Sequence, residues 1–406
     1  MKRLSLLILV AAAMLVSWAA GTPRYTVVVS LDGFRWDYCE AFDTPFLNSM
    51  ARRGVKAVMS PSFPSKTFPN HYTLATGLYP DHHGIVANSF LSPVTGRRYA
   101  LTDSVERTNP RYYGGDPIWL TAKRQGLVTA TVYWVGSDVA IKGEHATYWH
   151  DYMSKPLLTP AQRVDEVVRL LSLPAGERPR LVMCYFEEPD HSGHRYGPMS
   201  RPTRLAVQQL DTLLSRLWAR IQASPCAGEV NLIVTGDHGM TWIDSDRLVP
   251  VKHHLKPAWV KAVEGDLPGF IYVNRPDYAD SVLLALGHVD HIRAFKRSDL
   301  PAYLHFGTNP AIGDVVVIPD VGWLYTDKHY PAHVQGGSHG YDNTASDMQV
   351  GFRAMGPDFK VGYTKPSRFP NVDVYPLLCR LLGITPSPND GNLDEVADML
   401  RLALHP

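Results

Sequence analysis

The sequence predicts an α/β fold with a mainly parallel central sheet, helices on both faces of that sheet, and a smaller inserted α+β lobe. Three observations support this fold class. Apolar, β-branched runs alternate with segments of helical spacing, which is the order of a parallel sheet. Several of these runs are apolar throughout, as expected for strands buried on both faces. Three of them end at an aspartate, at Asp32, Asp190 and Asp237, and two of these aspartates, Asp32 and Asp237, stand beside a glycine.

The elements follow in order along the chain. Strands are predicted at residues 25–33, 55–60, 129–136, 180–190, 229–240 and 347–357. Helices are predicted at residues 46–54, 117–126, 161–173, 203–223 and 372–384. The helix at 203–223 carries a leucine stripe that we expect to pack in the core: Leu205, Leu210, Leu213, Leu214 and Leu217. Between residues 242 and 334 the pattern loosens, which predicts the inserted lobe.

Residues 1–20 have the composition of a secretory signal peptide. Lys2 and Arg3 precede an apolar run at 4–16, and small residues follow it. An uncleaved anchor is the alternative, but a span takes roughly 20 apolar residues. We therefore expect a mature chain of residues 21–406 that is periplasmic or secreted, with no stable membrane span.

The charge of the chain is balanced, with 40 Lys and Arg against 39 Asp and Glu and no basic run. A nucleic-acid-binding surface built on bulk charge is not indicated. Four cysteines in 406 residues do not make a disulfide scaffold. Cys184 and Cys379 lie in apolar segments and are expected to be buried thiols, whereas pairing of Cys39 with Cys226 is left open.

Thr67 lies in a proline-rich loop, PSFPSKTFPNHY, just before a segment compatible with a helix. A helix N-terminus offers free N–H groups and the positive end of a dipole, so a hydroxyl there is well placed to attack and carry a phosphoryl group. The alternative is that Thr67 is an ordinary helix N-cap.

The three strand-end aspartates indicate a ligand site. In parallel α/β sheets, ligands bind beyond the carboxyl ends of the strands. Any single aspartate there could instead be an N-cap or turn residue. Histidines accompany them in DHSGH (Asp190, His194), in GDHG (His238) and in GGSHGYDN (His339). Carboxylate and imidazole are zinc ligands, and with Thr67 the set numbers seven, enough for two zinc ions.

The combined motifs closely resemble the nucleotide pyrophosphatase/phosphodiesterase family of the alkaline phosphatase superfamily, as a free-standing bacterial-type catalytic domain. The matching segments are SLDGFRWDY, PSFPSKTFPNHYTLATGLYPDHHGIVAN, GGDPIWLTAKRQG, VGSDV, EEPDHSGHRYGP, VTGDHGM and GGSHGYDN. They extend from residue 30 to residue 343.

The resemblance implies a site of defined roles. One zinc would bind Asp190, His194 and His339, and the second Asp32, Thr67, Asp237 and His238. Asn88 and the Thr67 N–H would hold a phosphoryl oxygen. Phe68 and Tyr152 would sandwich a nucleotide base, although core packing of Phe68 and surface packing of Tyr152 are the alternatives. Among the remaining histidines, His71 and His83 flank Thr67 and could shape its loop, but they are given no catalytic role.

The implied activity is zinc-dependent hydrolysis of nucleotide phosphodiester and pyrophosphate bonds. A small nucleotide would be the substrate, and a nucleoside 5′-monophosphate would be released through a covalent nucleotidyl-threonine. A phosphate dianion is usually bound by arginine. Here the flat ring of Phe68 adjoins Thr67, which favours a nucleotide diester. The alternatives are a phospholipid- or phosphocholine-diester phosphodiesterase of the same family and a non-catalytic ligand-binding member.

Overall fold

Strand β1 (Tyr25–Leu31) lies at the centre of a nine-stranded sheet, and all seven of its residues are buried. In this computed structural model, which describes residues 24–152, 154–265, 267–326 and 335–401, the main order is β18-β2-β17-β8-β1-β7-β5-β6, with β19 beside β2. The other strands are β2 (Val55–Ser60), β5 (Thr129–Val132), β6 (Tyr148–Trp149), β7 (Leu181–Phe186), β8 (Val230–Thr235), β17 (Val350–Met355), β18 (Tyr363–Thr364) and β19 (Phe369–Pro370). Only β17 runs antiparallel to its neighbours among these described strands. The predicted mainly parallel sheet is confirmed.

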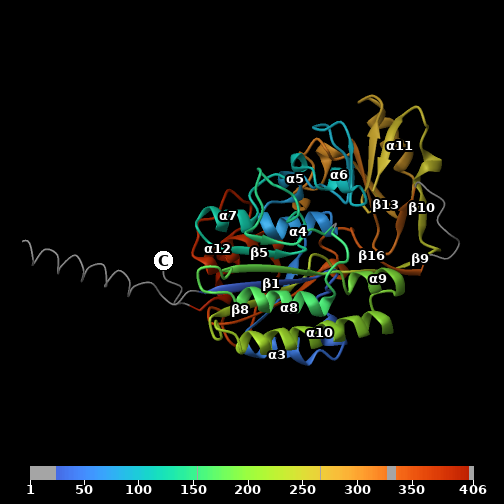
Figure 1. The fold of residues 1–406 in the computed structure, drawn as a ribbon. Coiled ribbons are helices and arrows are strands. Elements are labelled where there is room, and N and C mark those ends of the chain that lie inside the picture. Colours follow the sequence, from blue (N-terminus) through green and yellow to red (C-terminus); the bar gives the residue numbers. More distant parts are fainter. Residues whose placement is uncertain (1–23, 153, 266, 327–334, 402–406) are drawn as a thin grey trace, which may run out of the picture.

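Helices cover both faces of the sheet (Figure 1). One face carries α3 (Pro45–Arg53), α8 (Pro160–Leu171) and α10 (Arg201–Gln222), and the other carries α4 (Thr67–Thr76), α7 (Ile118–Arg124) and α12 (Val374–Leu382). Successive side chains of a strand point to opposite faces. Val27 and Val29 of β1 accordingly pack in one core and Val28 in the other. The apolar run of β1 is thus explained by burial on both sides.

Short elements connect these layers. They are α2 (Tyr38–Ala41), α5 (Pro80–His83), α6 (Ser104–Arg107), α9 (Asp190–Tyr196) and the hairpin of β3 (Ser89–Leu91) with β4 (Arg98–Ala100). Further one-turn 3-10 helices lie at 110–112, 251–254, 297–299, 302–304, 346–348, 371–373, 393–395 and 397–399.

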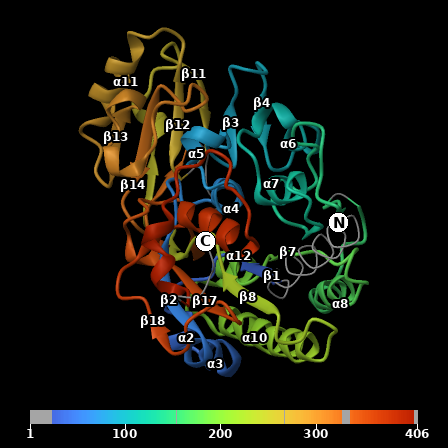
Figure 2. The same cartoon turned by 90° about the vertical axis from the view of Figure 1, so that its left-hand side faces the viewer.

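A second, antiparallel sheet lies away from α3 and α10 (Figure 2). Its order is β11 (Val260–Glu264), β12 (Gly269–Val273), β14 (Val315–Pro319) and β13 (Ile292–Lys296), and α11 (Tyr278–Leu286) packs against it. Two further pairs are β10 (Leu248–Pro250) with β15 (Leu324–Thr326) and β9 (Thr241–Asp244) with β16 (Gln335–Ser338). The boundaries 242–334 of an inserted lobe stay a prediction.

Several sequence expectations can be compared with this structure. Cys39, Cys184, Cys226 and Cys379 are all buried free thiols, as expected for Cys184 and Cys379. In the leucine stripe, Leu210, Leu214 and Leu217 are buried and Leu213 is half-buried against the same core. The expectation for Leu205 was wrong, because it lies five residues before Leu210, about 140° around the helix from the buried face, and is 43% exposed. The predicted signal peptide, 1–20, lies outside the described residues. Within those residues, no helix combines the length and apolar character needed to cross a bilayer.

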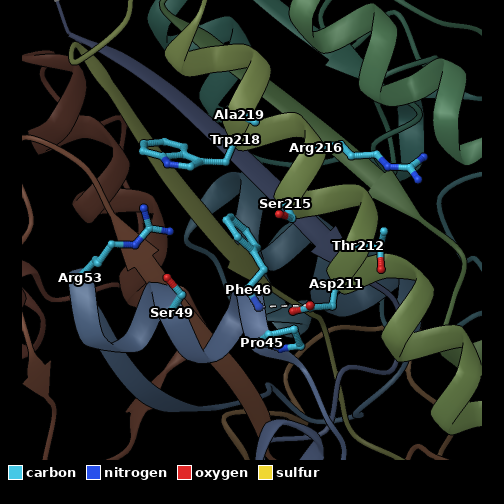
Figure 3. Close-up of a pocket in the computed structure, with 10 residues that line it drawn as sticks. All are labelled: Pro45, Phe46, Ser49, Arg53, Asp211, Thr212, Ser215, Arg216, Trp218 and Ala219. Carbon is cyan, nitrogen blue, oxygen red and sulfur yellow. Dashed lines mark hydrogen bonds between the residues drawn. The ribbon is translucent and has the colours of Figure 1, made fainter.

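Helix α3 takes its N-terminal cap from α10. The Asp211 carboxylate of α10 accepts the backbone N–H groups of Phe46 at 3.1 Å and Leu47 at 2.8 Å, as the first of these bonds shows in Figure 3. The residue at the ordinary cap position, Thr44, makes no side-chain cap bond. Asp211 therefore satisfies two N–H groups that the helix itself leaves without acceptors.

Replacing Asp211 with alanine should lower the free energy of unfolding by about 1–3 kcal/mol, because two buried N–H groups lose their acceptor. Denaturant unfolding measures the difference. Thr212→Ala is the matched control, since the exposed neighbour on the same helix should change stability by less than about 0.5 kcal/mol. Equal stability of the two variants would rule out this capping role.

Candidate active site

The carboxyl ends of β1 and β8 bring two of the predicted aspartates together. Asp32 directly follows β1, and Asp237 follows β8 with only Gly236 between them. The N–H of Gly33 donates to Asp237 Oδ1 at 3.1 Å. Gly33 has a φ of 70°, and a Cβ there would lie 3.1 Å from Asp190. A glycine is required at this turn both for its backbone angle and for the close approach of the third aspartate.

The first cluster consists of Asp32, Asp237 and His238. His238 Nε2 lies 3.3 Å from Asp32 Oδ1 and 3.0 Å from Asp237 Oδ2. All three residues are buried. Ligand atoms of the three lie within 4.8 Å of one another, which suits a single metal ion.

The second cluster joins the start of α9 to β16. Asp190 is the first residue of α9, and its Oδ1 lies 3.3 Å from Nε2 of His194, one turn later on the same helix. His339, just after β16, places Nε2 at 3.5 Å from Asp190 Oδ1 and 3.1 Å from His194 Nε2. The structure thus brings together the three residues predicted for the other zinc.

The two clusters adjoin through a pair of histidines. The rings of His238 and His339 stack with centroids 3.5 Å apart and an interplanar angle of 11°. His238 is also within 4.8 Å of the ligand atoms of Asp190 and His339. It therefore lies between both sets of donors.

The three histidines of the two clusters, His194, His238 and His339, all donate a hydrogen bond from Nδ1 to a backbone carbonyl. His194 Nδ1 donates to the carbonyl of Gly337 at 2.8 Å, His238 Nδ1 to that of Gly239 at 2.7 Å, and His339 Nδ1 to that of Ser65 at 2.9 Å. A carbonyl only accepts, so the proton is on Nδ1. In the neutral ring Nε2 then holds the lone pair, and all three Nε2 atoms face the clusters, as in metal-binding histidines.

The carboxylates also fit a cation. Three buried oxygens, Asp32 Oδ1, Asp190 Oδ1 and Asp237 Oδ2, have no hydrogen-bond partner among the described residues. Buried polar atoms are normally paired, and each such exception needs an explanation. Carboxylate oxygens and imidazole lone pairs that converge in this way match the ligand chemistry of Zn²⁺.

Burial and neighbouring charges shift the pKa values of the three aspartates. Burial raises the pKa of Asp32 well above its ordinary value, and the charges of Asp237 and Asp190 add to the rise. Burial likewise raises the pKa of Asp190. Burial opposes the charge of Asp237 too, but His238 and His71 outweigh it and hold the pKa of Asp237 well below its usual range.

The pKa values of His339 and His238 are shifted in opposite directions. Burial lowers the pKa of His339 well below its ordinary value, which keeps the ring neutral. For His238, burial disfavours the charged form, but the carboxylates of Asp237 and Asp190 raise its pKa. A metal ion bound at Nε2 of His238 would take the place of a proton.

Thr67 is the first residue of α4, and the N-cap position belongs to Lys66. The alternative interpretation of Thr67 as an N-cap is therefore wrong. Its hydroxyl Oγ1 instead lies 3.2 Å from His238 Nε2, beside the first cluster. The helix after it is fixed by Asn70, which donates to the carbonyls of Pro64 and Lys66 at 2.8 and 2.9 Å.

A cavity of about 320 Å³ opens beside Thr67. Its lining includes Asp32, Thr67, Phe68, Tyr152 and Asp190. Phe68 also packs against the core on one side, so the two interpretations of its ring are compatible. Tyr152 contacts the edge of Tyr133 at a centroid distance of 5.7 Å, and its ring lies beneath Arg107 and Lys155.

Asn88 lies next to the same helix start. Its Oδ1 accepts the N–H of Phe68 at 3.2 Å. This bond fixes the acceptor end of the amide, so the NH₂ group is the end that can face a ligand.

Sequence reasoning missed several residues of this site. Tyr185, in β7, donates its hydroxyl to Asp32 Oδ2 at 2.7 Å, and the buried ion pair of Arg107 with Asp138 lines the cavity. His71 contacts Asp237 and Thr67. For His71 a signal existed, because residues four apart share one helix face and His71 follows Thr67 at that spacing.

A mostly parallel sheet with aspartates and histidines gathered around a helix-borne threonine defines a protein of the alkaline phosphatase superfamily. Residues 26–342 match the family model described as type I phosphodiesterase / nucleotide pyrophosphatase. The chain belongs to this family.

Named relatives and solved structures agree with that assignment. The chain is 35% identical over 390 residues to ectonucleotide pyrophosphatase/phosphodiesterase family member 3 of Bos taurus, and 36% identical over 386 residues to a venom phosphodiesterase of Crotalus durissus collilineatus. The alignments cover 93% and 92% of this chain but only 44% and 46% of those relatives. The chain thus spans less than half the length of these curated relatives.

The fold is similar to that of murine ectonucleotide pyrophosphatase/phosphodiesterase 5, with a TM-score of 0.87 and 31% identity over 93% of this chain and 100% of that one. An inactive threonine-to-alanine variant of the murine protein, in complex with AMP, matches equally well.

Replacing Asp32 with asparagine should stabilise the metal-free protein by about 0.5–2 kcal/mol, a gain typical where a functional residue is held under strain. The amide keeps an acceptor for Tyr185 and removes a buried charge. Thermal unfolding with and without Zn²⁺ tests this, because the variant should gain less stability from Zn²⁺ than the wild type. The expected gain comes from removing the repulsion between Asp32 and the carboxylates of Asp237 and Asp190. A metal-free variant that is less stable than the wild type would contradict this repulsion.

The same groups give a pH dependence in the metal-free protein. Asp32 and Asp190, whose pKa values are raised, bind more protons in the folded than in the unfolded state. Their contribution to stability is therefore lost as pH rises from the ordinary aspartate pKa through their raised values, and this loss should be smaller in the Asp32→Asn variant.

Proposed function

We propose that this chain hydrolyses phosphodiester and pyrophosphate bonds of nucleotides and releases nucleoside 5′-monophosphates through a covalent nucleotidyl-threonine at Thr67. The observation that carries the proposal is the position of Thr67 Oγ1, 3.2 Å from His238 Nε2 and at the start of α4. A hydroxyl there has the clustered donors on one side and the aromatic cavity on the other.

Two zinc ions are the proposed cofactors. Asp190, His194 and His339 would hold one ion, and Asp32, Asp237, His238 and Thr67 the other. When bound, the metals would supply positive charge that favours the ionised hydroxyl and stabilises charge on phosphoryl and leaving-group oxygens. Asp32 and Asp190 have raised pKa values without metal, and the positive charge of a metal ion would stabilise their ionised forms.

The reaction proceeds by two displacements at phosphorus. Thr67 Oγ forms a bond to phosphorus as the bond to the leaving oxygen breaks, and that oxygen leaves with the electron pair and takes up a proton. Water then attacks phosphorus, the bond to Oγ breaks, and Oγ recovers a proton. Two in-line displacements retain the configuration at phosphorus.

The other residues bind and orient the substrate. Asn88, whose Oδ1 is held by the N–H of Phe68, presents its NH₂ group to a phosphoryl oxygen. Phe68 and Tyr152 line the cavity that would receive a base. An aromatic face stacks on any base, so this cavity would favour nucleotides but discriminate little between different bases.

Export of a catalytic domain, residues 21–406, after removal of a signal peptide at 1–20 completes the proposal. It rests on the composition of the N-terminus.

Replacing Thr67 with alanine should lower kcat by about 10³-fold or more, because the covalent route needs a side-chain oxygen. Zinc binding should persist, since the remaining donors are untouched. Thr67→Ser is the matched control and should keep measurable turnover. The assay is release of nitrophenol from the 4-nitrophenyl ester of TMP, and full turnover in the alanine variant would exclude a threonine nucleophile.

Replacing Phe68 with alanine should lower kcat/KM for the TMP ester by about 5- to 150-fold, the equivalent of roughly 1–3 kcal/mol of base stacking. Bis(4-nitrophenyl) phosphate lacks a nucleotide base, so its hydrolysis should change less. Wild-type activity on the TMP ester should exceed that on nitrophenyl phosphate and nitrophenyl phosphocholine, and a chelator should abolish it. A preference for nitrophenyl phosphocholine would favour a headgroup diesterase instead.

A further inference from the structure

A fully buried histidine connects the nucleophile's helix to a proposed metal ligand. His71 lies one turn after Thr67 in α4 and is 0% exposed. Its Nδ1 is 3.0 Å from the Thr67 carbonyl oxygen and 3.2 Å from Asp237 Oδ2. Its Nε2 is 2.8 Å from the hydroxyl of Ser30 in β1.

These contacts fix which nitrogen carries the proton. A carbonyl only accepts, so Nδ1 carries the proton and donates to the Thr67 carbonyl, and this edge of the ring also lies against the Asp237 carboxylate, with Nδ1 3.2 Å from Oδ2. The Ser30 hydroxyl can then donate to Nε2, so that each ring nitrogen has a hydrogen-bond partner. The ring is therefore held in one orientation by β1, α4 and the end of β8.

Aromatic neighbours restrain the ring further. The His71 ring meets Trp134 edge-on at 5.3 Å and Tyr185 edge-on at 5.1 Å. Trp134 Nε1 also donates to the His71 carbonyl at 3.0 Å, and Tyr185 donates to Asp32. Rotation of the ring would disturb its own contact with Asp237 and the packing of Tyr185, which donates to Asp32.

We propose that His71 is a positioning residue that fixes the Asp237 carboxylate relative to the Thr67 backbone and thereby sets the affinity of the metal position formed by Asp32, Asp237 and His238. The proposal rests on the proposed two-metal function. It assigns His71 no contact with substrate or metal. Groups that orient metal ligands in this way typically contribute 10- to 100-fold to affinity.

The test is Zn²⁺ binding measured by competition with a chromogenic chelator, together with thermal unfolding of the metal-free protein. His71→Leu should weaken one of the two Zn²⁺ ions by about 10- to 100-fold and leave the other within a few-fold. His71→Asn keeps an N–H donor near the place of Nδ1 and should recover most of that loss. Ser30→Ala, which removes the third anchor of the ring, should weaken the same ion by a smaller factor.

His83 provides the matched control. It is equally buried and touches the same helix, through Thr73 Oγ1 at 3.0 Å and the Pro69 carbonyl at 3.1 Å. Burial lowers the pKa of His83 to about 3, so its ring is neutral. His83→Leu should lower the melting temperature of the metal-free protein and leave both Zn²⁺ affinities unchanged.

The outcomes separate this inference from the proposed function. If His71→Leu, or Ser30→Ala where the leucine variant does not fold, binds both ions as the wild type does, the inference is overturned and the two-metal function stands. If His71→Leu and His83→Leu weaken zinc equally, His71 is a core residue only, which also overturns it. A wild-type protein that binds fewer than two Zn²⁺ ions overturns the proposed function and this inference with it.

Discussion

The constraint on which the structure depends is the convergence of three carboxylates at one edge of a sheet, two of them buried and the third, Asp190, 17% exposed at its side chain. Their positions follow from strand register, because Ser30 pairs with Thr235 across β1 and β8, and Leu31 pairs with Phe186 across β1 and β7. A slip of one residue would move a strand by about 3.3 Å and turn its side chains to the opposite face. The apolar packing that fixes register is therefore also what assembles the site.

The backbone around the site is closely packed, in keeping with the same constraint. A Cβ on Gly239 would lie 1.9 Å from the carbonyl of Asp347, so the loop that carries Asp237 and His238 is pressed against the chain after β16. His238 lies between both sets of donors, stacked on His339. The two proposed metal positions are thus not independent, since an ion in either one affects the charge that faces the other.

Much of the fold and of the candidate site could be predicted from the sequence. Continuous apolar runs such as Tyr25–Leu31 indicate buried strands, and aspartates after β1 and β8 indicate their shared edge. The sheet order could not be predicted, because the pairing of β17 between β2 and β8 depends on contacts far apart in the chain. Leu205 was assigned to the core because it belongs to a leucine-rich helix, but it lies five residues before Leu210, and this spacing turns it away from the buried face. The spacing of His71 from Thr67 places it beside the site, but its contact with Asp237 could not be predicted, because the sequence does not show what faces each ring nitrogen.

The three histidines that face the metal positions all direct Nδ1 at main-chain carbonyls, those of Ser65, Gly239 and Gly337. A carbonyl is present whatever side chain a residue carries, so no point mutation can delete the group that orients each imidazole. Sequence drift at such positions can act only through the path of the backbone. The orientation of these imidazoles therefore depends on the backbone conformation and is little affected by side-chain substitutions at the residues that supply the carbonyls.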